Sequence, residues 1–444
     1  MADSSQKKKV ALATLGCKVN QFESAAFLSA FSERDVEMVP FAQKADVYVI
    51  NTCAVTAKAG AQSRQMIRKA LRANPEARLV VTGCYAQIGS QDIMEIVEQP
   101  LCIIGNGFKQ NLVDAALSEQ HCDLEMLMGD ISRQKEVCPL EVKSFGERTR
   151  AYLKVQDGCN SFCTYCIVPF TRGRSRSQVP DQVLKQARVF AEGGYQELVV
   201  TGIHTGTYGH DLEPRTDLVA LMRQLLQECP LRYRISSLDP GEISEELLAL
   251  MAEESNLMPH LHIPLQSGDN DILKKMHRHY TREDFADLIK RTRKVLPDAA
   301  IGVDVMAGFP GEDERAFRNT YELLSGLSVT YLHVFPYSKR AGTVAAGMTD
   351  QILKKDKEER VAALRELDGR KKKEFYAAHL GEVREVLAEQ GSCRKVSDMK
   401  GFTDNYIPVT FAPPLEVANK VVKVRLERLG EDGVAGTMVE GGAE

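Results

Sequence analysis

Three cysteines in one short run are the residues best suited to chemistry in this chain. Cys159, Cys163 and Cys166, the loop trio, form a C-x-x-x-C-x-x-C motif within residues 157–169. Thiolates are soft ligands that suit zinc or an iron–sulfur cluster. A structural zinc site needs four protein ligands, and the motif supplies only three. Three thiolates on a four-iron cluster would leave one iron open to a substrate or cofactor, so the count favours chemistry over a structural site.

Three more cysteines, the sheet trio Cys17, Cys53 and Cys84, close short apolar runs near the N-terminus. These runs are 10–17, 47–53 and 79–84. Helix-like stretches at 20–31 and 56–73 follow the first two runs, and short buried strands alternating with helices predict a doubly wound parallel sheet over residues 8–135. Because the strands of such a sheet end at one edge, where ligands bind, we expect the three thiols to converge on one site.

Repeated β–α units follow between residues 145 and 377. Six β-type runs are separated by helix-length stretches and lie at 151–156, 197–201, 233–237, 260–265, 301–307 and 331–335. Such repeats predict a partial (β/α) barrel, in which the functional loops follow the strand ends. Cys159 comes just after the first run, where an active site belongs. The charged stretch 350–377 predicts a solvated helix packed on the side of this barrel.

The last segment, 380–442, predicts a small antiparallel β-barrel, because short β-type runs alternate with Gly, Asn and Pro turns. The runs are 383–388, 406–411, 421–426 and 436–439. Six basic residues lie among Phe402, Tyr406 and Phe411, and they are Arg394, Lys395, Lys400, Lys420, Lys423 and Arg425. Cations and aromatic rings together suit single-stranded nucleic acid, through phosphate contacts and base stacking. An ordinary small barrel can show the same pattern.

Composition sets the outer limits of these predictions. A chain of 444 residues, 43% of them hydrophobic, has room for two or three domains with proper cores. No run of about 18 apolar residues predicts a membrane span, and no apolar segment of a secretory signal follows the N-terminus. Eleven cysteines without such a signal predict reduced thiols in the cytoplasm, some of them metal ligands. With a net charge of −4, nucleic-acid binding would depend on local basic patches.

Two cysteine trios in this order resemble those of the radical S-adenosylmethionine (SAM) methylthiotransferases. The loop trio is similar to the radical SAM motif, with Tyr165 at a position that is usually aromatic. The surroundings of the sheet trio resemble the auxiliary-cluster domain of that family, and the C-terminal segment resembles its RNA-binding TRAM domain. Four stretches resemble the branch that acts on threonylcarbamoyladenosine in tRNA: 16–20, 157–166, 202–209 and 333–343.

The resemblance implies a tRNA-modifying transferase with two 4Fe-4S clusters. The loop trio would hold the cluster whose open iron binds SAM and cleaves it to a 5′-deoxyadenosyl radical. The sheet trio would hold a second cluster carrying the methylated sulfur that replaces the hydrogen on carbon 2 of the adenine. SAM would be both methyl donor and radical source, and no protein acid or base is required. The further partners implied are an electron donor such as flavodoxin or ferredoxin, and a sulfur source.

Candidates for SAM contact lie in the cluster loop, after predicted barrel strands or, for Asp304, within one. They are Tyr165, Gly202, His204, Gln266, Ser267 and Asp304. Tyr165 would pack on the adenine, and the stretch from Gly202 to His204 lies where radical enzymes of this kind contact the SAM amino group. Gln266 and Ser267 leave a strand exit and would contact the ribose. For each of them, an ordinary loop or strand exit is the alternative interpretation.

Candidates for RNA contact include three arginines after the loop trio, Arg172, Arg174 and Arg176. An extended strand would present all three to one side, toward the tRNA backbone or the SAM carboxylate, either of which Arg can bind bidentately. A surface strand within a salt-bridge network is the alternative. The C-terminal candidates are Lys400, Phe402 and Lys423. The other cysteines are predicted to be buried thiols; they are Cys102, Cys122, Cys138, Cys229 and Cys393.

Rival functions differ in substrate or in class. Methylthiotransferases that act on prenyladenosine in tRNA, or on an aspartate of a ribosomal protein, would share both trios. A non-catalytic, zinc-stabilised RNA-binding protein is the alternative from another class. It would need sites with four ligands, and two groups of three cysteines argue against it.

Overall fold

The computed structural model describes residues 7–98, 100–118, 124–146, 148–389, 398–412 and 417–439. The chain divides into two compact units. The first contains Met1–Phe145, Lys154–Val179 and Ser338–Ala346, and the second contains Gly146–Leu153, Pro180–Tyr337 and Gly347–Glu444. Four residues named above lie outside the described residues, namely Cys122, Cys393, Arg394 and Lys395.

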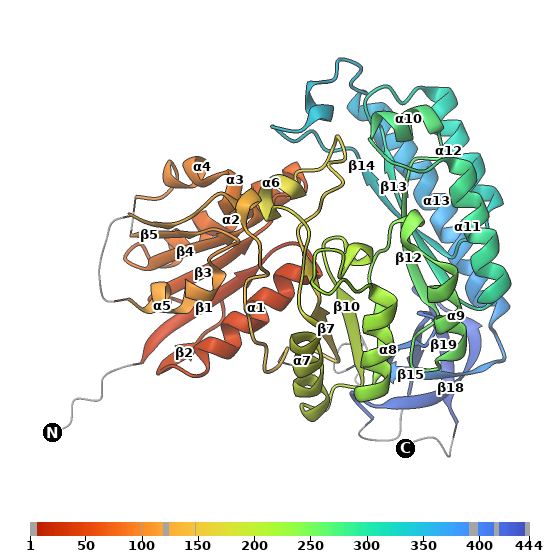
Figure 1. The fold of residues 1–444 in the computed structure, drawn as a ribbon, viewed down its shortest axis with the longest axis horizontal. Helices are drawn as coiled ribbons and strands as arrows, with labels where there is room; N and C mark the ends of the chain where they lie inside the picture. The colour runs from red at the N-terminus through yellow and green to blue at the C-terminus, as the bar shows by residue number, and fades with distance from the viewer. Residues whose placement is uncertain are drawn as a thin grey trace. The chain divides into compact units, whose positions relative to one another are not determined.

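A six-stranded parallel sheet forms the centre of the first unit (Figure 1), in the order β2-β1-β3-β4-β5-β6. The bounds are β1 Lys8–Thr14, β2 Val36–Met38, β3 Val47–Thr52, β4 Arg78–Gly83, β5 Leu101–Ile104 and β6 Leu124–Leu127. This confirms the doubly wound sheet predicted from the alternation of strands and helices. The sequence prediction missed β2, β5 and β6, which have only three or four residues each.

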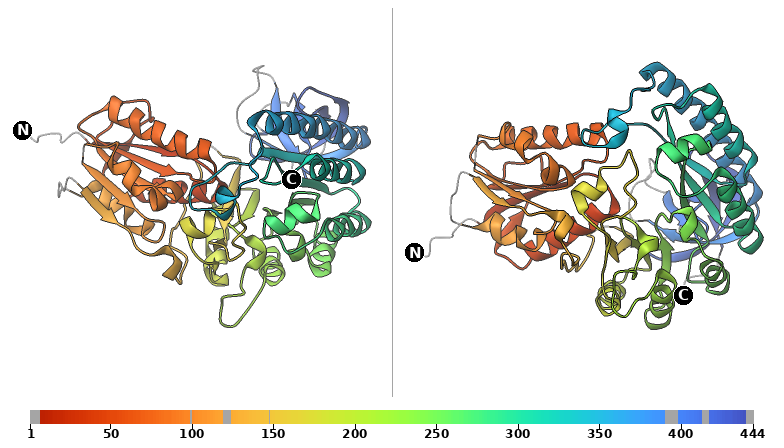
Figure 2. Two further views of the ribbon diagram at one scale, coloured as in Figure 1. Left: turned by 90° about the horizontal axis from the view of Figure 1, so that it is seen from above. Right: turned by 45° about the horizontal axis from the view of Figure 1, so that its top comes forward.

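Helices cover both faces of this sheet (Figures 1 and 2). One face packs against α1 (Lys18–Phe31) and α5 (Leu112–Leu117), and the other against α2 (Ala57–Ala73), α3 (Cys84–Ile88) and α4 (Ser90–Met94). Successive side chains of a strand point to opposite faces. Val49 therefore joins the core under α1, whereas Ile50 joins the core under α2. Burial on both faces explains why the strands read as continuous apolar runs.

The cluster loop also belongs to the first unit. The short strands β8 (Gln156–Asp157) and β9 (Arg176–Ser177) pair antiparallel, and between them lie the loop trio and helix α6 (Val168–Arg172). The prediction of one extended strand carrying Arg172, Arg174 and Arg176 is therefore wrong. Gly173, at φ +75°, turns the chain after α6, and a Cβ there would lie 2.2 Å from the carbonyl oxygen of Ile131.

The second unit contains a partial (β/α) barrel made of two three-stranded sheets, β11-β10-β7 and β12-β13-β14. The bounds are β7 Arg150–Lys154, β10 Glu197–Thr201, β11 Arg232–Ile235, β12 His260–Gln266, β13 Ala300–Ala307 and β14 Tyr331–Pro336. All six strands coincide with predicted runs. A single bridge, between Tyr233 and Leu257, links β11 to the segment that leads into β12.

Helices α7 to α13 accompany these strands (Figure 1). They are α7 Pro180–Glu192, α8 Leu218–Glu228, α9 Glu245–Glu253, α10 Asn270–Lys275, α11 Arg282–Val295, α12 Glu314–Gly326 and α13 Lys354–Ala378. Side-chain caps explain several of the starts: Asp217, Ser244 and Thr281 each accept a hydrogen bond from a backbone N–H of the first turn. The charged helix α13 packs on β14, where Asp368 accepts a hydrogen bond from the backbone N–H of Leu332.

A closed five-stranded barrel ends the second unit, in the order β15-β16-β17-β19-β18. The bounds are β15 Val383–Ala388, β16 Met399–Thr403, β17 Pro408–Phe411, β18 Val421–Leu429 and β19 Val434–Met438. Phe411 and alternate valines such as Val422 and Val424 fill its core. One pair, β17 with β19, is parallel, so the barrel is not purely antiparallel as predicted. Tyr406 has φ 67° and belongs to the turn before β17, so the predicted run 406–411 begins too early.

A buried carboxylate stabilises the sheet on which this barrel rests. Glu197 of β10 has no exposed surface and accepts hydrogen bonds from Arg150 Nε (2.6 Å) and Arg234 Nε (2.8 Å). Arg232 Nε lies 3.4 Å from the same carboxylate. Burial opposes the charge of Glu197, but Arg234, Arg150 and Arg232 outweigh burial and lower its pKa to about 2.

Two of these arginines also hold the C-terminal barrel. Arg150 donates a hydrogen bond to Glu389 (2.5 Å). Arg234 donates to the backbone carbonyl oxygens of Thr403 (2.9 Å) and Asp404 (2.8 Å). The charge of Glu197 thus fixes the side chains that connect β7 and β11 to the barrel.

We expect Glu197→Gln to lower the free energy of unfolding by about 3–5 kcal/mol at neutral pH, because it leaves buried arginines without their anion. Urea titration followed by circular dichroism would measure this change. The usual pKa of Glu is about 4.3, so the stabilisation is complete above that pH and is lost as the pH falls through about 2. The difference between variant and parent should therefore shrink over that interval.

Glu228→Gln is the matched control. Glu228 pairs with Arg188 on the surface, and exposed pairs contribute less than about 1 kcal/mol. A Glu197→Gln effect as small as that of the control, or one unchanged between about pH 6 and 2, would contradict a stabilising role for the ionised carboxylate.

Candidate active site

The ends of three neighbouring parallel strands bring the sheet trio together. Cys17 follows β1, Cys53 follows β3 and Cys84 follows β4, and all three are free thiols. Burial raises the pKa of the Cys53 thiol to about 11, and the charges of Cys84 and Cys17 act in the same direction. The three sulfur atoms are thus near enough to influence one another, in agreement with the convergence expected from the sheet topology.

Two glycines permit this approach. Gly16 and Gly83 each precede a cysteine of the trio and have φ of +98° and +95°. A Cβ on Gly16 would lie 2.8 Å from both Cβ and Sγ of Cys53, and a Cβ on Gly83 would lie 2.3 Å from the carbonyl oxygen of Thr52. Any other residue at these positions would push the strand ends, and the thiols with them, apart.

The loop trio lies in a tightly turned segment between β8 and α6. The backbone N–H of Cys159 donates to the carbonyl oxygen of Gly173 (3.1 Å), and that of Cys166 donates to Cys163 (2.9 Å). Cys163 is buried, whereas Cys159 and Cys166 are partly exposed. Tyr165, a candidate for adenine packing, is partly buried in the same loop; its contact with SAM stays a prediction.

A network of buried charges adjoins both trios, and the sequence prediction missed it. Glu23 of α1 and Arg172 of α6 are each 1% exposed. Arg172 binds both oxygens of Glu23, at 2.9 and 3.2 Å, and both oxygens of Asp157, at 3.1 Å. Lys109 also pairs with Glu23, and Lys154 pairs with Asp157 at 2.7 Å. Glu23 lies in a correctly predicted helix, and only tertiary packing shows that it faces inward.

This network changes the interpretation of the three arginines. Arg172 and Arg176 are 1% and 5% exposed, and the Nη2 of Arg176 donates to the carbonyl oxygen of Arg172 at 2.7 Å. Both are therefore enclosed by protein, which contradicts their predicted contact with tRNA phosphates or the SAM carboxylate. Arg174 alone is exposed, with its guanidinium 4.7 Å from the ring centroid of Phe162. It stays a candidate for contact with RNA.

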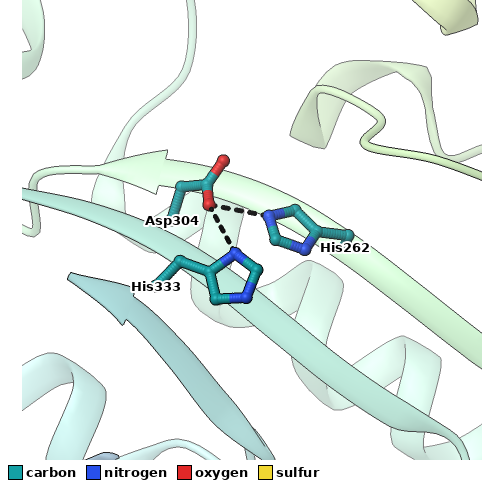
Figure 3. Close-up of side chains that lie close together, drawn as sticks. All are labelled: His262, Asp304 and His333. Atoms are coloured by element: carbon teal, nitrogen blue, oxygen red, sulfur yellow. Dashed lines mark hydrogen bonds and ion pairs between the residues drawn. The ribbon is translucent and has the colours of Figure 1, made fainter. Parts of the chain in front are cut away.

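Asp304 lies in a cluster of three side chains from adjacent strands (Figure 3). His262 of β12 and His333 of β14 point toward its carboxylate, with Nε2 of His262 at 2.7 Å and Nδ1 of His333 at 3.3 Å from Oδ1. Burial opposes the charge of Asp304, but hydrogen bonds and charges of both imidazoles outweigh it and hold its pKa well below the usual range. An ionised, oriented carboxylate suits hydrogen bonding to ribose hydroxyls. The three groups could also hold a metal ion.

His204, the candidate at the end of β10, has protein partners of its own. Its Nε2 lies 2.5 Å from Glu242 and 3.5 Å from Asp239, and Asp239 also binds Arg278 at 2.6 Å. This second group of His and carboxylates could likewise hold a metal ion. Gly202 is partly exposed directly after β10, and its contact with the SAM amino group stays a prediction.

The two candidates after β12 differ in their surroundings. The Oε1 of Gln266 is buried and has no hydrogen-bond partner among the described residues. The residue has φ 65° at an irregularity in the β12–β13 pairing. A strained residue with an unsatisfied polar atom is typical of a ligand site. Ser267 is fully buried, and its hydroxyl accepts from the backbone N–H of Asp269 at 3.2 Å. Ser267 therefore stabilises the turn, which argues against the predicted ribose contact.

The C-terminal barrel exposes two of its three RNA candidates. Lys400 of β16 and Lys423 of β18 are exposed. Phe402 stacks on Tyr406, with centroids 4.8 Å apart, and the Arg150 guanidinium lies 5.1 Å from the Phe402 ring. Tyr406 in turn lies 4.4 Å from the ring of His260. These rings join the barrel to the β-sheets, which argues against the predicted stacking on RNA bases.

Comparison with known proteins identifies the family. Residues 153–324 match the radical SAM superfamily, and residues 9–105 match an uncharacterized protein family, UPF0004. The threonylcarbamoyladenosine tRNA methylthiotransferase of Bacillus subtilis is 41% identical over 95% of this chain and 94% of its own length. The enzyme of that name from Aquifex aeolicus is 39% identical over 94% and 99%. This chain belongs to the radical SAM methylthiotransferase family. It is therefore a transferase.

A second branch of the family and a solved structure extend the comparison. The tRNA-2-methylthio-N(6)-dimethylallyladenosine synthase of Bacillus subtilis is 30% identical over 97% of this chain and 86% of its own length. The structure of the radical SAM methyltransferase TsrM from Kitasatospora setae, with cobalamin and a 4Fe-4S cluster bound, superimposes with a TM-score of 0.55. It covers 77% of each chain at 14% identity, so the likeness is one of fold. Among the described residues, no helix has the length and apolar character needed to cross a membrane.

Radical SAM family membership implies SAM and a 4Fe-4S cluster, and the sheet trio offers a donor set that fits a second cluster. Its three thiols come from three separate strand ends, and Arg172 and Lys109 both interact electrostatically with Cys84. Metal binding requires thiolates rather than thiols. The two cations would offset part of the negative charge of thiolate ligands.

We expect Gln266→Leu to weaken SAM binding by about tenfold, because roughly one hydrogen bond to SAM would be lost. The stability of the protein without SAM should not fall, because the Oε1 of Gln266 has no partner among the described residues. Isothermal titration calorimetry of SAM with the cluster-loaded enzyme, beside urea unfolding, would separate the two quantities. Gln196→Leu, at an exposed residue before β10, is the control. Unchanged SAM affinity in Gln266→Leu would remove Gln266 from the SAM site.

Proposed function

We propose that this enzyme replaces the hydrogen on carbon 2 of threonylcarbamoyladenosine, next to the anticodon of tRNA, with a methylthio group. The observation that carries the proposal is the presence of two three-thiol sites, the loop trio and the sheet trio, in one compact unit. Each supplies one ligand fewer than a closed structural zinc site requires. Identity of 41% to an enzyme named for threonylcarbamoyladenosine, against 30% to one named for dimethylallyladenosine, supports the choice of substrate.

The proposal gives each group of residues a role. The loop trio would hold the cluster that binds SAM, and the sheet trio would hold an auxiliary cluster. When bound, these cofactors supply the radical and the methylated sulfur, with SAM as both methyl donor and radical source. Gln266 and Asp304 would orient SAM, whereas Arg174, Lys400 and Lys423 would bind the RNA backbone. No acid or base from the protein is assigned.

The proposal also implies partners and a location. tRNA would be the substrate, and the adenosine must leave its stack to reach the clusters. A reductant such as flavodoxin or ferredoxin would supply electrons, and a separate sulfur source would reload the auxiliary site. All of these are found in the cytoplasm, where reduced thiols persist.

Mass spectrometry of nucleosides from bulk tRNA tests the substrate. Cells that lack this protein should lose the methylthio group on threonylcarbamoyladenosine, and re-expression should restore it. A response of methylthio-prenyladenosine instead would keep the reaction class and reject the substrate. Unchanged tRNA would reject tRNA altogether and favour the ribosomal-protein aspartate.

Cysteine variants test the division of labour between the trios. Any Ala substitution in the loop trio should abolish the formation of 5′-deoxyadenosine from SAM. Substitutions in the sheet trio should spare 5′-deoxyadenosine but abolish the methylthio product. Chromatography of both products in one assay measures the two outcomes, with Cys229→Ala, a buried cysteine of the second unit, as the control. If only sheet-trio variants lost 5′-deoxyadenosine, the assigned roles would be reversed.

A further inference from the structure

The buried charges around Arg172 connect the elements that carry the two trios. Glu23 lies six residues after Cys17 in α1, Asp157 lies two residues before Cys159, and Arg172 lies six residues after Cys166. The single guanidinium of Arg172 binds Glu23 and Asp157 together, within one compact unit. Displacement of either carboxylate would therefore move a loop that carries a cysteine trio.

A further hydrogen bond ties Arg172 to the edge of the sheet. Its Nη2 donates to Oδ1 of Asn20 at 2.6 Å, and the side-chain amide of Asn20 donates to the carbonyl oxygens of Leu15 (2.6 Å) and Thr52 (3.0 Å). Leu15 and Thr52 lie within two residues of Cys17 and Cys53. Asn20 is 1% exposed. Hydrogen bonds through Asn20 therefore connect Arg172 to the backbone beside two cysteines of the sheet trio.

The network carries more positive than negative charge. Its ion pairs contain three cations, Lys109, Lys154 and Arg172, and two carboxylates, Glu23 and Asp157. The buried Arg176 also acts on Asp157, so the cations outnumber the carboxylates. The five paired side chains are at most 7% exposed. A buried charge without a counter-ion is strongly destabilising, so an anion is expected beside this network.

The sheet trio is the neighbouring source of negative charge. Burial opposes the charge of Arg172, but Asp157 and Glu23, with a further contribution from Cys84 and Cys17, outweigh it and raise its pKa well above the usual value. Burial lowers the pKa of Lys109, and the negative charges of Glu23 and Cys84 oppose that shift. Three thiolates that ligate a cluster would supply the negative charge that the network lacks.

We propose that Arg172 is a positioning residue that fixes the two trios relative to each other and provides the positive countercharge of the sheet-trio cluster. This inference rests on the proposed function, because it requires an auxiliary cluster on Cys17, Cys53 and Cys84. The reduction potential of an iron–sulfur cluster depends on the charge around it. A fixed cation stabilises the reduced, more negative cluster, so Arg172 raises its potential and Glu23 lowers it.

The charge arm of the test measures the auxiliary cluster by itself. The full chain with all three loop-trio cysteines replaced by Ala would retain only that cluster, and redox titration followed by electron paramagnetic resonance gives its midpoint potential. Arg172→Met should shift the potential to more negative values, and Glu23→Gln should shift it to more positive values. Arg34→Gln, which removes an exposed arginine of the same unit, should leave it unchanged.

The positioning arm uses the enzyme with all its cysteines. Arg172→Lys keeps the positive charge but cannot bind both carboxylates in a fork. We expect a potential close to that of the parent, while the methylthio product formed per 5′-deoxyadenosine falls by about ten- to a hundredfold, since small misplacement of reacting groups has effects of that size. A potential and a product ratio that both match the parent would exclude a positioning role.

The signs of the shifts decide the charge role. Opposite shifts of the midpoint potential in Arg172→Met and Glu23→Gln support the charge role, because general disruption of the site would not depend on the sign of the removed charge. Shifts in the same direction, or no shift, overturn the charge role. If Arg172→Met fails to bind iron, Glu23→Gln decides: a positive shift supports the role, and any other result overturns it. Iron analysis of the parent protein distinguishes failure of the proposed function from failure of the role of Arg172. If the parent lacks an auxiliary cluster, the proposed function itself is contradicted.

Discussion

One guanidinium group, that of Arg172, holds together the part of the molecule where the chemistry is expected. It lies among Glu23, Asp157 and Asn20 with almost no exposed surface. In water such ion pairs contribute little, but in a buried site the loss of one partner leaves the others uncompensated. The geometry of α1, β8 and α6 is therefore coupled: these three elements cannot shift independently while Arg172 binds them.

The second unit uses the same physical device for another purpose. Glu197 is surrounded by Arg150, Arg232 and Arg234, and the arginines extend from it to the C-terminal barrel. In both units a buried carboxylate is kept ionised by an excess of cations. In the first unit the surplus positive charge lies beside the sheet trio. In the second unit Arg150 and Arg234 donate further hydrogen bonds to Glu389 and to backbone carbonyl oxygens. The same interaction thus supports a candidate cofactor site in one case and a domain junction in the other.

The thiols and the polar candidates play different parts in the proposed reaction. Cysteine ligands determine which cofactors can bind, and three thiols per site would leave a place for a substrate on each proposed cluster. Gln266, at the end of β12, and Asp304, within β13, add an unsatisfied and an oriented oxygen atom. Because the cofactors carry the radical chemistry, the contribution of the protein is placement and charge, and Arg172 contributes to both.

The sequence alone determined the fold class, most of the strands and the longer helices of both units, and the convergence of Cys17, Cys53 and Cys84, but it missed β16 and several shorter elements. These follow from local periodicity and from the rule that parallel strands end at one edge. Tertiary structure decided the roles of single polar residues. Arg172, Ser267 and Phe402 are suitable ligands by residue type, yet each is engaged by its own protein. Burial and pairing depend on contacts between residues far apart in the chain, such as Glu23 with Arg172, and no local pattern encodes those contacts.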